Sequence, residues 1–267
     1  MSQHRLLIWA CIFLCLAASA AALAAPLPVD LRDWYEFRHS SALPGMLFGV
    51  TPQGQVGFGG AFQQNIPVAY TPTFKNFVAG GNTGSNNHNP QFGLSGTKVN
   101  GTLFAGAGAF QSPHGLWVSW MATGNTWEGC WNAQWQVLGP TDPASFKPAV
   151  AVGVQDLFDE RNGPLTEHHS ARSFYAVATG SLPQATWRPI YWTVGIGNGR
   201  FKNGIAGLNV PIDDHFKLIG EWDSFNLNAG VAWGLHGAQN YTSSDIIAYA
   251  GETHLKYPVL GMTVTWH

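Results

Sequence analysis

Apolar and polar side chains alternate from His215 to Gly234, and the alternation changes phase once. Up to Asp223 the even positions are apolar or glycine, whereas after Phe225 the large apolar side chains stand at odd positions. A period of two is typical of a β-strand whose two faces meet different surroundings. The segment therefore predicts two antiparallel strands joined by a tight turn.

The same period recurs along most of the chain, separated by clusters of Gly, Asn and Pro that are typical of turns. The clearest further strands are residues 115–123, 125–139, 187–199, 245–257 and 259–267. Weaker alternation marks residues 55–63, 92–99, 102–110, 148–158, 172–182 and 204–211. We expect 12 strands, with 10 or 14 as alternatives.

Three segments do not follow the strand pattern. Residues 79–90, which contain GGNTGSNNHNP, and residues 159–171, which contain DERNGPLTEHHSA, are predicted to be long loops. Residues 30–41 fit either a short helix or a first strand.

The N-terminus has the composition of a secretory signal. A basic start is followed by an apolar run and then by small residues, so we expect cleavage after Ala24. Residues 25–44 are then a lead-in segment and residues 45–267 a β-barrel domain. Loss of the signal leaves Cys130 as the single thiol, which excludes an internal disulfide and a cysteine-only metal site.

Composition bears on what covers the apolar faces. Charged residues make up 10% of the chain and aromatics 13%, with 12 Trp and 32 Gly, whereas soluble domains carry roughly 25% charge. A net charge of -2 and the lack of a basic stripe exclude an electrostatic footprint for nucleic acid. A soluble sandwich or propeller would bury the apolar faces, whereas a membrane barrel would turn them toward lipid.

Strand length and aromatic placement favour the membrane. Strands of about 9–11 residues cross a bilayer when tilted, and Trp residues lie toward strand ends, where interfacial girdles form. Hydrocarbon offers backbone groups no hydrogen-bond partner, so a spanning sheet has to close. We therefore predict an all-β fold, a closed antiparallel transmembrane β-barrel of about 12 strands, with outer-membrane lipid around it.

Alternation assigns side chains to the two faces of this barrel, although it does not show whether the lumen is open or plugged. The expected lumen-facing residues are Lys217, Glu221, Asp223, Asn226, Asn228, Glu252, His254, Lys256, Glu128, Asn132 and Gln134. The expected lipid-facing aromatics are Trp127, Trp131, Trp135, Trp192, Trp222, Trp233 and Trp266.

Several phrases in the C-terminal half carry a family resemblance: AVAVGVQDLF, SFYAVATG, VGIGNGRFKNGIAGLNVPI and IGEWDSFNLNAGVAW. A weaker one, LPGMLFGVTPQGQVGFG, lies near the N-terminus. On these phrases the chain resembles the YjbH-like family of outer-membrane β-barrel proteins associated with exopolysaccharide production. The resemblance implies a role in making or exporting surface polysaccharide, with polysaccharide and export-machinery proteins as partners.

Two residue pairs could serve acid–base chemistry. Glu221 and Asp223 share one face of a strand, but such a pair more often consists of lumen charges paired with Lys or Arg, here Lys217, Lys256 or Arg200. Glu252 and His254 share another face, and a serine such as Ser119 or Ser173 could complete a hydrolase site. We assign no catalytic residue.

Two further motifs are weak. Glu167, His168 and His169 could bind a metal, but adjacent His side chains in a strand point to opposite faces and no second ligand cluster has matching spacing. The GIGNG run lacks the spacing and the following helix of a dinucleotide site. We therefore expect no metal and no cofactor.

The sequence thus favours a non-enzymatic outer-membrane barrel, acting in surface-polysaccharide production or export or as a narrow channel. The alternatives are an outer-membrane lipid-modifying hydrolase and a secreted soluble carbohydrate-binding β protein.

Overall fold

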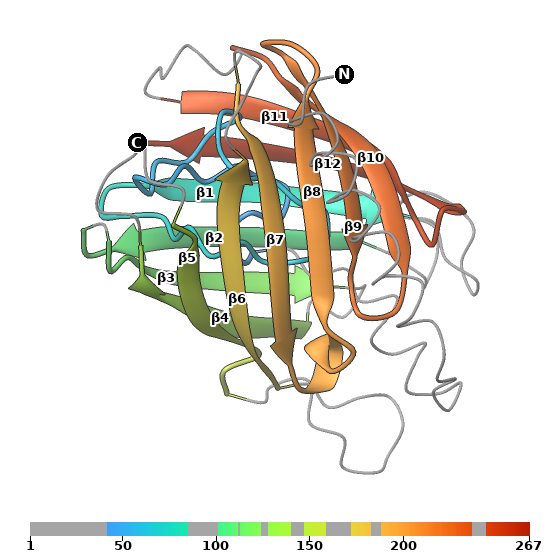
Figure 1. Cartoon of the computed structure of the whole chain (residues 1–267). Helices are drawn as coiled ribbons and strands as arrows, with labels where there is room; N and C mark the ends of the chain where they lie inside the picture. Colours follow the sequence, from blue (N-terminus) through green and yellow to red (C-terminus); the bar gives the residue numbers. More distant parts are fainter. Residues whose placement is uncertain are drawn as a thin grey trace.

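The structure is a computed structural model that describes residues 42–84, 101–111, 113–123, 128–139, 147–158, 172–182, 188–236 and 244–267. Twelve strands in these residues form one closed antiparallel barrel, in which each strand pairs with the strands before and after it in the sequence (Figure 1). The prediction of an all-β, closed antiparallel barrel of about 12 strands is confirmed.

The strands are β1 (Phe77–Gly84), β2 (Gly101–Ala109), β3 (Leu116–Thr123), β4 (Glu128–Leu138), β5 (Ala149–Gln155), β6 (Ser173–Leu182), β7 (Ile190–Gly197), β8 (Ile205–Pro211), β9 (Phe216–Trp222), β10 (Leu227–Gly234), β11 (Ser244–Thr253) and β12 (Tyr257–Trp266). A single turn of 3-10 helix, η2 (Gly199–Phe201), follows β7.

The first and last strands close the barrel. All eight residues of β1 pair with β12, from Phe77 opposite Trp266 to Gly84 opposite Val259. The other side of β1 pairs with β2. Closure leaves the sheet without an edge strand, so the backbone donors and acceptors of the wall are satisfied within the wall.

The wall carries apolar side chains outside and a mixture of polar and apolar side chains inside. In β9 the even residues Phe216 and Leu218 are exposed, whereas Lys217, Ile219 and Glu221 are buried. The same alternation runs through β2 and β6. Because the buried residues face the barrel axis, the outer surface carries most of the exposed large apolar side chains.

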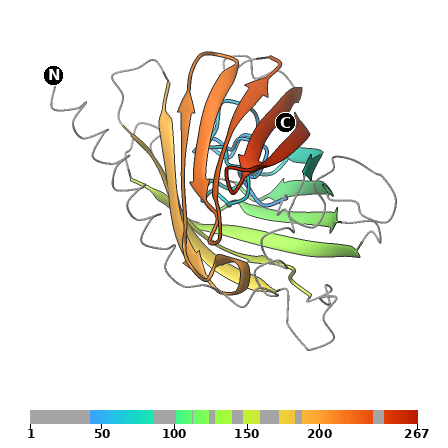
Figure 2. The ribbon, with the colours of Figure 1, turned by 90° about the vertical axis from the view of Figure 1, so that its right-hand side faces the viewer.

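Residues 42–76 lie inside the barrel and will be called the internal segment (Figures 1 and 2). Most of its side chains are fully buried and form one core with the inner wall. The segment folds on itself through isolated bridges that join Val50 to Val56 and to Ala61, and Met46 to Gln63. The lumen is therefore filled along this segment.

Two expectations about the N-terminal half need correction. Residues 55–63 do not form a strand of the sheet, because they belong to the internal segment and their backbone bonds stay within it or go to wall side chains. The predicted loop at residues 79–90 overlaps β1, in which a Cβ at Gly80 or Gly81 would crowd atoms of the adjacent strands β12 and β2. The domain division, with a barrel domain at residues 45–267, stays a prediction; the first strand begins at Phe77.

The strands expected at residues 102–110, 148–158, 172–182 and 204–211 correspond to β2, β5, β6 and β8. The signal at residues 1–24, the segment 30–41, the strand at 92–99 and the loop at 159–171 lie outside the described residues.

Glycines on the inner face make room for the internal segment. A Cβ at Gly234 would overlap the Phe58 side chain, and a Cβ at Gly207 would lie 2.6 Å from the Gln63 amide. By contrast, a Cβ at Gly220, on the outer face of β9, would meet nothing within 4 Å. Some of the glycines in the wall are therefore required to leave space for the internal segment.

We expect Gly234→Ala to lower the free energy of unfolding by about 1–3 kcal/mol, because the added methyl group overpacks Phe58. Gly220→Ala is the matched control and is expected to leave it unchanged or to raise it slightly. Denaturant titration of both variants in detergent measures the difference. Equal stabilities would contradict the placement of Phe58 against the wall.

Candidate functional site

The candidate site is the contact between the internal segment and the inner wall. Lys217 on β9 is 2% exposed, and its Nζ donates to the Gly60 carbonyl oxygen at 2.6 Å. The same ammonium lies 4.8 Å from the centre of the Phe58 ring, an arrangement that favours a buried cation. The Lys217 ammonium thus binds both the Gly60 carbonyl group and the Phe58 ring of the internal segment.

Glu221 lies on the same face of β9 as Lys217, and its carboxylate binds backbone amides of the internal segment. Its Oε2 accepts from the Gln64 amide at 2.8 Å, and its Oε1 accepts from the Asn65 amide at 2.8 Å. Asn228 on β10 donates its Nδ2 to Oε1 at 3.0 Å. Both carboxylate oxygens are therefore satisfied by N–H donors, as a buried carboxylate requires.

Asp223 extends this network to the turn between β9 and β10. Its Oδ1 accepts from the backbone amides of Phe225 and Asn226, at 3.1 and 2.8 Å, and so fixes the turn. Its Oδ2 accepts from Asn228 Nδ2 at 2.9 Å. Asn228 therefore joins the two carboxylates, so that the turn and the internal segment are held by one network.

Uncharged side chains hold the opposite side of the segment. Gln134 on β4 donates its Nε2 to the Val68 carbonyl oxygen at 2.9 Å and accepts from the Tyr175 hydroxyl at 2.7 Å. Thr179 on β6 accepts from the Ala69 amide at 2.8 Å. Contacts from β4, β6 and β9 surround the segment, which places it on the barrel axis rather than against one wall.

Tyr70 shows how dry this interior is. Its ring packs edge-on against Tyr191 of β7, with ring centres 5.9 Å apart. Burial raises the pKa of the Tyr70 hydroxyl above its ordinary value, because the phenolate would be poorly solvated there. The hydroxyl is therefore neutral at physiological pH.

The structure brings most of the expected lumen residues together and leaves three outside. Those buried on the inner face are Lys217, Glu221, Asp223, Asn226, Asn228, Asn132 and Gln134. Glu252, His254 and Lys256 are exposed instead, which differs from the expectation. Glu252 lies within β11 and follows its alternation: Ile247 and Tyr249 at odd positions are buried, so the even position of Glu252 faces outward. His254 and Lys256 lie between β11 and β12, where the alternation no longer separates inside from outside. Glu128 begins β4, and its side chain lies outside what the structure describes.

The expected outward aromatics divide in the same way. Trp131, Trp135, Trp233 and Trp266 are exposed, and Trp192 is half-buried against Gly180. Trp222 is 5% exposed, contrary to the expectation. It is the last residue of β9, and the turn that follows is buried, so exposure stops following the alternation there. Trp127 lies outside the described residues.

The residues considered for hydrolysis have other partners. Ser119 Oγ donates to the Ala42 carbonyl oxygen at 2.7 Å, and Ser173 Oγ accepts from the Arg200 amide at 3.0 Å. The His254 ring lies against Asn226 Oδ1, at 2.7 Å. In the described residues, three or more His, Cys, Asp or Glu side chains do not gather in an arrangement that could hold a metal ion. Residues 167–169 lie outside them.

Sequence reasoning missed the wall residues that bind the segment on other strands: Trp117, Gln136, Thr179, Asn209, Asp245 and Tyr249. Their polar atoms reach backbone or side-chain groups of the internal segment. The available signal was polar or aromatic residues with the inward parity, but it could not show that a segment of the same chain lies opposite them.

No protein-family model and no curated protein sequence matches the chain. In the described part of the chain, none of the helices is long and apolar enough to span a membrane.

We expect Glu221→Gln to loosen the internal segment. One carboxylate oxygen becomes the NH2 group of a side-chain amide, which cannot accept from the Gln64 or Asn65 backbone amide, and an unsatisfied buried donor costs about 1–3 kcal/mol. Hydrogen exchange at these two amides should rise by about tenfold, which corresponds to ~1.4 kcal/mol. The matched control is Glu252→Gln, an exposed carboxyl at the end of β11, with an expected change within about 0.5 kcal/mol. Unchanged hydrogen exchange in Glu221→Gln would show that the carboxylate does not hold the internal segment in place.

Proposed function

We propose that the protein is an outer-membrane β-barrel whose lumen is closed at rest by residues 42–76. The single observation that carries the proposal is the polarity of the wall. Large apolar side chains such as Leu103, Ile196 and Met262 are exposed on the outside, while Lys217 and Glu221 are buried within. Water would penalise so large an apolar surface, whereas lipid tails accept it.

Aromatic side chains support the same placement. Phe77 and Trp266 pair across β1 and β12, with ring centres 5.3 Å apart. Phe216 and Trp233 pair across β9 and β10 near the same end of the barrel, and all four are exposed. A ring of aromatic residues at one rim is typical of the interface between bilayer and water.

The closed lumen defines what kind of passage the barrel could provide. Side chains from at least six strands contact the internal segment, so a solute meets packed protein and not a continuous water column. A narrow channel therefore requires displacement of the segment. The charges that hold it, Lys217 and Glu221, would then line the opened lumen and meet the solute.

The role in surface polysaccharide is the more specific part of the proposal. Its support is the resemblance of AVAVGVQDLF, SFYAVATG and the neighbouring phrases to the YjbH-like barrels. These phrases fall in β5, β6 and the β7–β10 region, which supply Thr179, Asn209, Lys217 and Glu221 to the site. The partners proposed on this basis are a polysaccharide and proteins of its export machinery.

The membrane placement is tested by fractionation and gel mobility. We expect the protein in the outer-membrane fraction, with a folded form that migrates differently from the heated form because the closed barrel resists detergent. Recovery in the periplasm without detergent would overturn the proposal and favour a secreted soluble carbohydrate-binding protein.

The closed lumen is tested by conductance in planar bilayers. We expect the unmodified protein to be largely silent, and the double variant Lys217→Met with Glu221→Gln to open frequently, because both charged contacts to the segment are lost. Glu252→Gln serves as the control and should remain silent. Equal, steady conductance in all three proteins would show that residues 42–76 do not close the lumen.

The polysaccharide role is tested in the source bacterium. Deletion of the gene should change the yield of secreted polysaccharide, and the double variant should fail to restore it if transport depends on a controlled lumen. Unchanged yield after deletion would leave the barrel without this role.

A further inference from the structure

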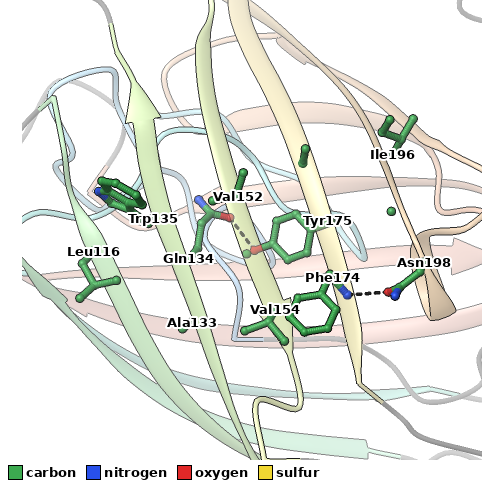
Figure 3. A pocket seen from close by; sticks show the side chains of 13 residues that line it. Leu116, Ala133, Gln134, Trp135, Val152, Val154, Phe174, Tyr175, Ile196 and Asn198 are labelled. Atoms are coloured by element: carbon green, nitrogen blue, oxygen red, sulfur yellow. Dashed lines mark hydrogen bonds between the residues drawn. The ribbon is translucent and has the colours of Figure 1, made fainter.

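A groove crosses the outer wall of the barrel over β4, β5 and β6 (Figure 3). Its volume is about 660 Å³, within the roughly 300–1,000 Å³ usual for small-molecule sites. Its lining is almost entirely apolar, from Leu116 on β3 to Ile196 on β7. This groove is separate from the lumen, because the wall lies between them.

Strand register explains why the wall is hollow here. One outward row runs Leu116, Trp135, Val152, Ala176 and Ile196 across five neighbouring strands. In this row only Ala176 is small. Large exposed side chains therefore stand on both sides of it.

The next outward row deepens the hollow. It runs Ala133, Val154 and Phe174, and Val154 is only 7% exposed although it points away from the barrel axis. Ala133, Val154 and Ala176 thus form a floor, and Trp135, Phe174 and Ile196 form the walls, with exposed fractions of 50, 51 and 71%.

One end of the groove is polar, and an exposed lysine lies at the same end of the barrel. Asn198 lies there and accepts from the Phe174 amide through Oδ1, at 2.7 Å, which directs its Nδ2 away from that bond. Lys202, the residue after η2, is exposed at the same end of the barrel. An apolar trough with an amide donor and an ammonium group at one end matches a lipid, with its acyl chain in the trough and an anionic headgroup at the rim.

Strand connections indicate which leaflet this end meets. The two longest stretches of sequence between strands join Gly84 to Gly101 and Gln155 to Ser173, and these four strand ends lie at the same end of the barrel as Asn198. The first strand begins and the last strand ends at the opposite rim. Outer-membrane barrels place long loops outside and short turns toward the periplasm. The polar end then lies in the outer leaflet.

We propose that this groove holds an acyl chain of a phosphorylated glycolipid of the outer leaflet, with its phosphate at Asn198 and Lys202. The inference rests on the proposed outer-membrane location. Bulk lipid tails are as apolar as the groove, so preference for this position comes from packing against the walls and from the phosphate contact. The bound lipid would be retained longer than its neighbours and would be sensitive to the shape of the groove.

Native mass spectrometry of the full chain, folded in detergent and mixed with purified lipid A, tests the proposal. We expect one retained lipid A on the unmodified protein and about fivefold less on Ala176→Phe, whose ring would fill the floor, and on Ala133→Phe as a second filling variant. Ala250→Phe, at an exposed position on β11, is the matched control and should retain lipid A normally. Lys202→Gln should lower retention by about threefold, because a single exposed charge is lost.

Normal retention by both filling variants, or equal loss in Ala250→Phe, would show that lipid A does not bind in this groove. Equal retention of phosphatidylglycerol by the unmodified protein would overturn the assignment to a glycolipid. Each variant is first shown by heat-dependent gel mobility to be folded. If the protein is found in the outer membrane but both filling variants bind lipid A normally, only this inference is wrong. If the protein is recovered in soluble form, the proposed function is wrong.

Discussion

Closure of the sheet between β1 and β12 is the constraint on which the rest of this structure depends. Once β1 pairs with β12 as well as with β2, every strand has two neighbours and the wall needs no hydrogen-bond partner from its surroundings. The outer side chains are then free to be apolar, and the inner ones have to find partners inside. The polarity of the wall and the content of the lumen are consequences of that one closure.

The side chains on the inner face find their partners in a segment of the same chain. Lys217 and Glu221 are both buried on β9, yet they bind the segment and not each other: the ammonium takes a carbonyl oxygen, and the carboxylate takes two amides. Displacing the segment would leave both charges without these bonds, which is costly unless water or a solute replaces them. In the proposed channel, the same residues would keep the lumen closed and would bind a polar solute once the segment is displaced. The outer groove belongs to the other face, where small residues in two adjacent rows leave a hollow.

The strand pattern predicted much of the wall correctly because its signal is local. Alternation at Lys217, Glu221 and Asn228 showed which residues share a face. Once the polar face is taken to be the inner face of the barrel, this is enough to place them inside. The signal failed at strand ends. Trp222 is buried and His254 and Lys256 are exposed, because the alternation separates two faces only while the strand continues in the sheet. In β11 the apolar residues Ile247 and Tyr249 face the interior, so Glu252 faces outward, opposite to the expectation. The signal also failed at residues 55–63, where Val56, Phe58 and Phe62 alternate as a strand does but pack inside the barrel.

By itself, the sequence determined that the chain forms about 12 strands with two unlike faces, since a period of two follows from backbone geometry. Only the tertiary structure decided what each face meets. That residues 42–76 fill the lumen, that Glu221 holds the Gln64 and Asn65 amides, and that Gly234 leaves room for Phe58 all depend on contacts between residues far apart in the chain. Such contacts are set by the closed ring of strands, and no local pattern encodes which part of the chain will lie within it.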